Sequence, residues 1–131
     1  MEKTHDTRVP YASALPYTAA DGSLVRELFH PEIHGEVSTS LAEMVVAPFG
    51  ESALYTHPGS HLTVHFLEGR GSMRVGARVF QTNERDTVCV PAKTAWQVQN
   101  SGDCFLRFLC FFSPFHKHSE TIIVSANGKQ S

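Results

Sequence analysis

Short runs of alternating apolar and polar residues, separated by turn residues, extend along most of the chain. Such alternation is typical of β-strands, because successive side chains point to opposite faces of a sheet. In HLTVHFL, for example, Leu62, Val64 and Phe66 share one face while His61 and His65 share the other. We predict strands at residues 24–28, 41–47, 53–57, 61–67, 72–75, 78–81, 87–90, 94–99, 104–112 and 121–124.

Turn residues separate these runs, and no segment has the apolar period of a convincing amphipathic helix. The breaks contain residues that fix or tolerate turn conformations, as at Pro58 and Gly59. Many short strands at regular spacing predict an all-β sandwich or barrel. We expect one barrel domain at residues 21–125, an N-terminal arm at residues 1–20 and a flexible tail at residues 126–131.

The composition fits one globular domain, since 41% of the 131 residues are hydrophobic and can fill a core. The net charge is −2 with no long basic run, so neither nucleic acid nor a membrane is an expected partner. Cys89, Cys104 and Cys110 form no Cys-x-x-Cys motif. We therefore expect free thiols in a reducing cytoplasm, with Cys104 and Cys110 buried.

The run CFLRFLCFF at residues 104–112 is apolar on both faces apart from Arg107. Such a strand is typical of a position buried on two sides or at a subunit interface. With the N-terminal arm, it is a candidate interface for a homodimer, and the sequence leaves monomer and dimer open.

Two segments resemble the sequence motifs of the cupin superfamily. The second motif of that family is Gly, five residues, Pro, one residue, Gly, two residues, His, three residues and Asn. Residues 85–100 read RDTVCVPAKTAWQVQN, in which Pro91 and Asn100 occupy their usual positions. Arg85 and Lys93 stand where the glycines are usual, and Trp96 stands where the histidine is usual.

The first motif is His-x-His, three or four residues, Glu, six residues and Gly, and residues 54–76, LYTHPGSHLTVHFLEGRGSMRVG, resemble it. The ending FLEGRG matches closely. Counting back from Gly69 places Tyr55 and His57 at the two histidine positions, and the glutamate position falls on Leu62, or on His61 at the shorter spacing. The resemblance covers roughly residues 40–115 and implies a double-stranded β-helix, or jelly-roll barrel, in agreement with the strand pattern.

The resemblance also implies a divalent metal, held by the two histidines and the glutamate of the first motif and the histidine of the second. Leu62 and Trp96 have no lone pair for a metal, so we expect the usual site to be absent and no cofactor to be bound. The alternative is a divalent metal such as zinc, iron or nickel on Tyr55, His57 and His61. The polar face expected for His61 argues against this set.

An aromatic cavity with one imidazole remains once the usual ligands are lost. Tyr55 and His57 share a face, and His57 can transfer a proton while Tyr55 acts as the paired acid. Trp96 and Phe66 are candidates to contact a small-molecule substrate. Glu43 is a further candidate to contact the substrate or orient His57, and an exposed strand charge is its alternative reading.

These features predict a metal-independent enzyme that performs acid–base chemistry on a small organic substrate, by dehydration, isomerisation, epimerisation or cyclisation. Some metal-free cupins, such as sugar-nucleotide epimerases, use a histidine base with a tyrosine acid, which is a resemblance in mechanism type. Two alternatives are a non-catalytic module that binds a small molecule and a divalent-metal enzyme with the Tyr/His/His set. The sequence does not identify the substrate.

Overall fold

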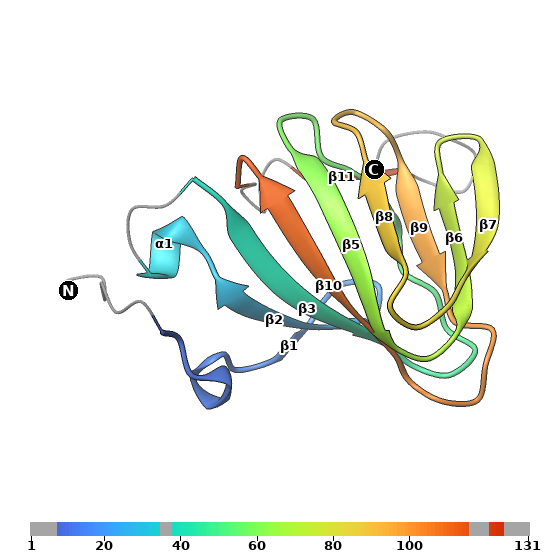
Figure 1. Ribbon diagram of the computed structural model, residues 1–131, viewed down its shortest axis with the longest axis horizontal. Helices are drawn as coiled ribbons and strands as arrows, with labels where there is room; N and C mark the ends of the chain where they lie inside the picture. The colour runs from blue at the N-terminus through green and yellow to red at the C-terminus, as the bar shows by residue number, and fades with distance from the viewer. Residues whose placement is uncertain (1–7, 35–37, 116–120, 125–131) are drawn as a thin grey trace.

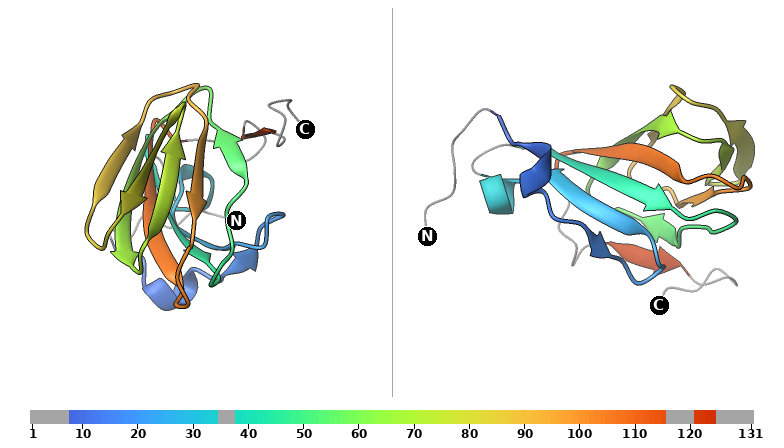
Figure 2. Two further views of the ribbon diagram at one scale, coloured as in Figure 1. Left: turned by 90° about the vertical axis from the view of Figure 1, so that its right-hand side faces the viewer. Right: turned by 90° about the horizontal axis from the view of Figure 1, so that it is seen from below.

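Two antiparallel sheets form the fold in the computed structural model, which describes residues 8–34, 38–115 and 121–124 (Figures 1 and 2). The six-stranded sheet runs in the order β1 (Tyr17–Thr18), β2 (Leu24–Phe29), β3 (Ser40–Val46), β10 (Leu106–Ser113), β5 (His61–Glu68) and β8 (Thr87–Val90). The five-stranded sheet runs in the order β11 (Ile122–Val124), β4 (Leu54–Thr56), β9 (Trp96–Gln99), β6 (Gly71–Val75) and β7 (Arg78–Thr82).

This arrangement confirms the predicted all-β jelly-roll barrel, and each of the ten predicted strands is present with its ends shifted by one or two residues at most. The sequence did not predict β1, the 3-10 helix η1 (Tyr11–Ser13) or the short helix α1 (Pro31–His34). These elements lie beside β2, far from β6 and β7 (Figure 1). The tail predicted for residues 126–131 lies outside the described residues. In the part of the chain that the structure describes, no helix could span a membrane.

The core lies between the two sheets and follows the alternation in the sequence. In β5, Leu62, Val64 and Phe66 are at most 1% exposed, whereas His61 is exposed on the other face. Each fully buried side chain of this kind stabilises the fold by about 1.5–3 kcal/mol. Cys110 of β10 is buried as expected, but the expectation for Cys104 is wrong, because it precedes the strand and is exposed.

The FLEGRG ending is required where β5 passes into β6. Gly69 has a φ of +86°, and a Cβ there would lie 2.7 Å from the carbonyl oxygen of Phe105. A Cβ on Gly71 would lie 2.2 Å from the carbonyl oxygen of Gln99. Backbone segments approach each other too closely here for any side chain, which explains the two glycines.

The second motif keeps the backbone of its usual glycines without the glycines themselves. Arg85 has a φ of +73° and Lys93 has a φ of +67°, both in the left-handed region that glycine adopts without strain. The amide of Arg85 donates to the carbonyl of Phe66, which fixes the turn against β5. The barrel therefore retains the turn geometry despite the substitutions.

The hairpin of β1 and β2 joins part of the predicted arm to the sheet. Tyr17 pairs with Val25 and Thr18 pairs with Leu24. The turn between the strands contains Gly22 with a φ of +90°. The hairpin thereby carries Tyr17 to the edge of the barrel, next to the cavity described below.

Candidate functional site

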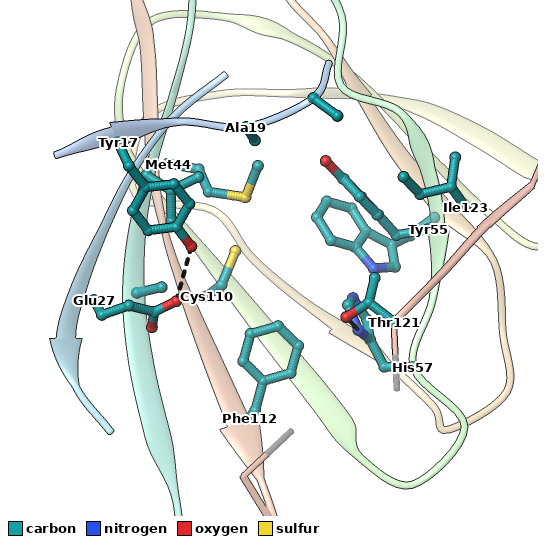
Figure 3. A pocket seen from close by; sticks show the side chains of 14 residues that line it. Tyr17, Ala19, Glu27, Met44, Tyr55, His57, Cys110, Phe112, Thr121 and Ile123 are labelled. Carbon is teal, nitrogen blue, oxygen red and sulfur yellow. Dashed lines mark hydrogen bonds between the residues drawn. The ribbon is translucent and has the colours of Figure 1, made fainter. Parts of the chain in front are cut away.

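A cavity of about 220 Å³ is lined by residues from both sheets and from the β1–β2 hairpin. Its wall is largely apolar and includes Val25, Ala42, Met44, Phe112 and Ile123. Polar groups come from two sides: Tyr17 and Glu27 lie on one side, and His57 and Thr121 lie on the other (Figure 3). An apolar cavity with a few convergent polar groups is typical of a small-molecule site.

The imidazole of His57 lies in this wall and is only 7% exposed. Its Nδ1 is 3.3 Å from the hydroxyl oxygen of Thr121. The His57 and Phe112 rings meet edge to face, with their centroids 4.8 Å apart. The centroid of the Trp96 ring, at the start of β9, lies 5.9 Å from the centroid of the His57 ring. These contacts fix the position of an imidazole at the cavity, as the sequence predicted.

Tyr17 and Glu27 form the opposite wall, and neither was identified from the sequence. The Tyr17 hydroxyl donates a hydrogen bond of 3.1 Å to Oε1 of Glu27. Burial, followed by the charge of Glu27 and this hydrogen bond, raises the pKa of Tyr17. The phenol therefore stays protonated at neutral pH and remains a hydrogen-bond donor.

The Tyr55 ring lines the cavity, but its hydroxyl is bound elsewhere. It donates a hydrogen bond of 2.5 Å to Oδ2 of Asp21 in the β1–β2 turn. Burial and this carboxylate raise the pKa of Tyr55. The Tyr55 hydroxyl therefore anchors β4 to the β1–β2 turn. The phenol that lies beside Glu27 in the cavity wall is that of Tyr17.

Trp96 lies across the sheet from Tyr55, in register with it, and the two rings are 5.2 Å apart. Trp96 is 1% exposed and lines the cavity as predicted. Among the described residues, no group forms a hydrogen bond with its buried indole Nε1. Cys110 also lines the cavity, and burial raises the pKa of its thiol, so that it is not a thiolate at neutral pH.

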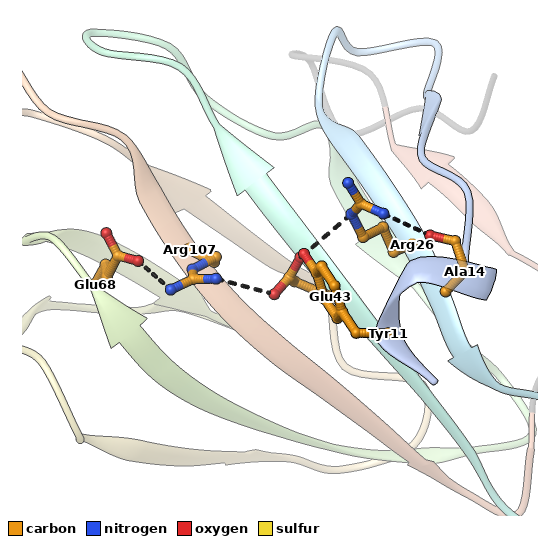
Figure 4. A network of polar contacts seen from close by, with 6 residues as sticks. All are labelled: Tyr11, Ala14, Arg26, Glu43, Glu68 and Arg107. Carbon is orange, nitrogen blue, oxygen red and sulfur yellow. Dashed lines mark hydrogen bonds and ion pairs between the residues drawn. The ribbon is translucent and has the colours of Figure 1, made fainter. Parts of the chain in front are cut away.

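Glu43 does not contact His57, and it is not an exposed charge either. It is 4% exposed and lies on the outer face of β3, opposite the cavity-lining Ala42 and Met44. The Tyr11 hydroxyl donates to its Oε1 at 2.6 Å, and Arg107 lies 3.4 Å from its Oε2 (Figure 4). Both earlier hypotheses for Glu43 are therefore corrected: it anchors the N-terminal segment to the sheet.

The same network continues on either side of Glu43. Arg26 lies 3.8 Å from Glu43 and donates to the carbonyl of Ala14 at 2.6 Å, while Arg107 also pairs with Glu68 (Figure 4). The two arginines are partly exposed whereas the Glu43 side chain is buried, so the network joins neighbouring strands and the N-terminal segment around one buried carboxylate. The network therefore has a structural role and no contact with the cavity.

The metal ligands considered from the sequence do not meet in the structure. His61 is exposed on the outer side of β5, and Leu62, at the alternative position, is buried in the core. Only His57 of the Tyr55, His57 and His61 set brings an imidazole to the cavity. Among the described residues, no three His, Cys, Asp or Glu side chains are grouped to hold a metal, so the donor set does not fit one.

Phe66 packs in the core, with its ring 5.5 Å from that of Phe108, and is not among the described lining residues. Its expected contact with a substrate is therefore not formed by this cavity.

The signal that could have found Tyr17 is the Asp21-Gly22 pair, because Asp-Gly between strand-forming residues predicts a hairpin.

Residues 42–112 match the family described as the cupin domain. An uncharacterized protein of Methanocaldococcus jannaschii is 36% identical over 117 residues, which cover 89% of this chain and 94% of that protein.

Two crystal structures show the same fold at low identity. A cupin-2 domain protein from Rhodospirillum rubrum has a TM-score of 0.75 and 21% identity, over 97% of this chain and 86% of that one. The polyketide cyclase RemF from Streptomyces resistomycificus has a TM-score of 0.71 and 17% identity, over 82% of this chain and 79% of that one. At sequence identities this low, the similarity shows a shared fold and does not show a shared activity.

Proposed function

The chain belongs to the cupin family, and from that premise we propose that its barrel cavity is the active site of an enzyme that moves a proton on a small organic substrate without a metal. The observation that carries the proposal is the position of His57 in the wall of a mostly apolar cavity, with Tyr17 and Glu27 on the far side (Figure 3). A base and an acid on opposite walls can act on one bound molecule.

The proposed first step is removal of a proton from a carbon next to a carbonyl group. The imidazole of His57 takes the proton, the C–H bond breaks, and its electron pair moves onto the carbonyl oxygen as an enolate. Histidine suits this step because its ordinary pKa lies near neutral pH.

The second step decides the reaction type. Return of the proton to the opposite face gives epimerisation, and return to another carbon gives isomerisation. If a hydroxyl group leaves from the neighbouring carbon, it takes up a proton and departs as water, which gives dehydration. Attack of the enolate carbon on a second carbonyl, followed by protonation of that oxygen, gives cyclisation.

Tyr17 is the proposed acid of the pair in place of Tyr55. Tyr17 and its acceptor Glu27 both line the cavity, so in the proposed step the Tyr17 O–H turns from Glu27 to an oxygen of the bound substrate. The hydroxyl of Tyr55 is held by Asp21 instead. Asp21, the acceptor of Tyr55, is not among the described lining residues. The polyketide cyclase RemF has the same fold, which supports the proposal that a barrel of this kind can be the site of a cyclisation.

Exchange with solvent deuterium tests the proposal before the natural product is known. The purified protein is incubated in D₂O with a panel of small ketones, and deuterium next to the carbonyl is followed by mass spectrometry. We expect exchange by the unmodified protein and a loss of about 100-fold or more in His57→Gln. The matched control His61→Gln changes an exposed histidine and should retain full exchange.

Two outcomes would contradict the proposal. Equal exchange by His57→Gln would place the base elsewhere. Binding of ketones with no exchange by any protein would favour the alternative of a non-catalytic binding module.

A further inference from the structure

The buried indole N–H of Trp96 is a hydrogen-bond donor in the cavity wall whose acceptor is missing among the described groups. Trp96 lines the cavity and is 1% exposed, and its Nε1 forms no hydrogen bond with any described residue. Leaving such a group unsatisfied costs about 1–3 kcal/mol. Buried donors are nearly always paired, so an unpaired one beside a cavity points to an acceptor that arrives with a ligand.

The size of the cavity limits that ligand. Its volume of about 220 Å³ is below the roughly 300–1,000 Å³ of pockets that hold drug-sized compounds. The rings of Tyr55, His57 and Trp96 are tilted by 24–39° from one another at centroid distances of 5.2–6.1 Å. A small planar molecule matches this wall because flat rings pack well against aromatic faces.

Charge limits the ligand further. The lining residues described include Glu27 and no lysine or arginine. The carboxylate of Glu27 accepts the Tyr17 hydroxyl and presents a negative charge on this side of the cavity. A cavity of this composition favours an uncharged ligand over a carboxylate or phosphate.

We propose that the cavity takes a small, uncharged, single-ring carbonyl compound, whose carbonyl oxygen accepts the hydrogen bond of the Trp96 indole N–H and whose hydroxyl group faces Tyr17 and Glu27. This inference rests on the proposed function only in taking this cavity as the substrate site. In the proton-transfer step, the same N–H stabilises the oxygen as negative charge develops on it. Trp96 is thus a specificity-determining residue.

The test uses the single tryptophan of the chain, whose indole N–H gives one resonance in a proton–nitrogen correlation spectrum. Three probes of similar shape are titrated: 4′-hydroxyacetophenone, 4-ethylphenol, which lacks the carbonyl, and 4-hydroxybenzoate, which is an anion. We expect the ketone to move the indole proton downfield and to bind about two- to tenfold more tightly than 4-ethylphenol. 4-Hydroxybenzoate should bind more weakly than the ketone.

Variants separate this inference from the proposed function. Trp96→Phe keeps an aromatic ring and should abolish the preference for the ketone over 4-ethylphenol, with folding checked by the methyl spectrum. His57→Gln should lose deuterium exchange but keep the indole shift and the preference. In the unmodified protein, an indole shift without deuterium exchange would overturn the assignment of His57 as the base and leave the ligand class intact.

Four results would overturn the ligand class. They are an indole resonance that the ketone does not move, an equal shift with 4-ethylphenol, tighter binding of 4-hydroxybenzoate, and no perturbation of any cavity resonance by the three probes. The comparison of probes on the unmodified protein decides the question even if Trp96→Phe fails to fold.

Discussion

The hydroxyl of Tyr55 in β4 donates a hydrogen bond of 2.5 Å to the carboxylate of Asp21, 34 residues earlier in the β1–β2 turn. The same carboxylate accepts the backbone amides of Ala53 at 2.8 Å and Ser23 at 2.9 Å. Asp21 therefore ties the hairpin to the far sheet. Because Ala19 and Ala20 of this turn line the cavity, the tie also holds this part of the cavity wall in place.

Tyr55→Phe is expected to lower the free energy of unfolding by about 1–2 kcal/mol, because it removes a hydrogen bond to a charged group. Urea unfolding measures this loss. Asp21→Asn serves as the partner in a double-mutant cycle, in which the two effects should fall short of additivity. Fully additive losses would show that the contact contributes nothing to stability.

The stability of the protein should fall in acid partly through Asp21. Burial alone would raise the pKa of this carboxyl, but the hydrogen bonds from Tyr55, Ala53 and Ser23 outweigh it and hold the pKa below the usual 3.8. A lowered pKa in the folded state gives stability that is present above 3.8 and is lost as the pH falls through the folded value. The advantage of the unmodified protein over Asp21→Asn should therefore shrink in that window, as measured by urea unfolding at a series of pH values.

Lys93→Gly should stabilise the fold by about 0.5–1 kcal/mol, because relief of left-handed strain exceeds the added entropy of the unfolded chain. Lys93 has a φ of +67°, and Arg85→Gly offers a second test at a φ of +73°. Arg78→Gly is the matched control, since Arg78 is exposed in β7 without a positive φ, and it should destabilise by about 0.5–1 kcal/mol. Destabilisation by all three changes would argue against strain at these turns.

Cys89 and Cys104 should react with a thiol reagent in the native protein, while Cys110 reacts only on unfolding. The first two are exposed, whereas Cys110 is 1% exposed and burial raises the pKa of its thiol. Titration with Ellman's reagent before and after denaturant measures the difference. In Cys110→Ala the slow thiol should disappear; rapid reaction of all three thiols in the unmodified protein would contradict the expected burial.

Alternation and turn residues were sufficient to predict an all-β sandwich or barrel, and the resemblance to the cupin motifs implied the jelly-roll barrel. In β5, for instance, the pattern HLTVHFLE places every second residue in the core, so His61 was correctly expected on the outside. The position of His57 in the cavity wall also followed from the resemblance to the first cupin motif. Local patterns of this kind depend on neighbours within a few residues, which the sequence displays directly.

The contacts that were missed depend on pairing between distant segments. Glu43 reads as an exposed strand charge until the N-terminal segment brings Tyr11 and the neighbouring strands bring Arg26 and Arg107 to it. The direction of the Tyr55 hydroxyl depends on where the hairpin places Asp21. Alternation predicts the face on which a side chain lies, but it does not reveal which remote group comes to cover that face.

The β1–β2 hairpin provides part of the cavity wall from the edge of its sheet, through Tyr17, Ala19 and Ala20. The strands that carry most of the core, such as β5 and β10, lie farther inside the sheet, and of the three hairpin residues Ala19 packs against that core. Ligand preference can therefore be altered in one short peripheral segment while the folding of the barrel is preserved. A library randomised at positions 17 and 20, with Ala19 kept, would be a short route to new selectivity.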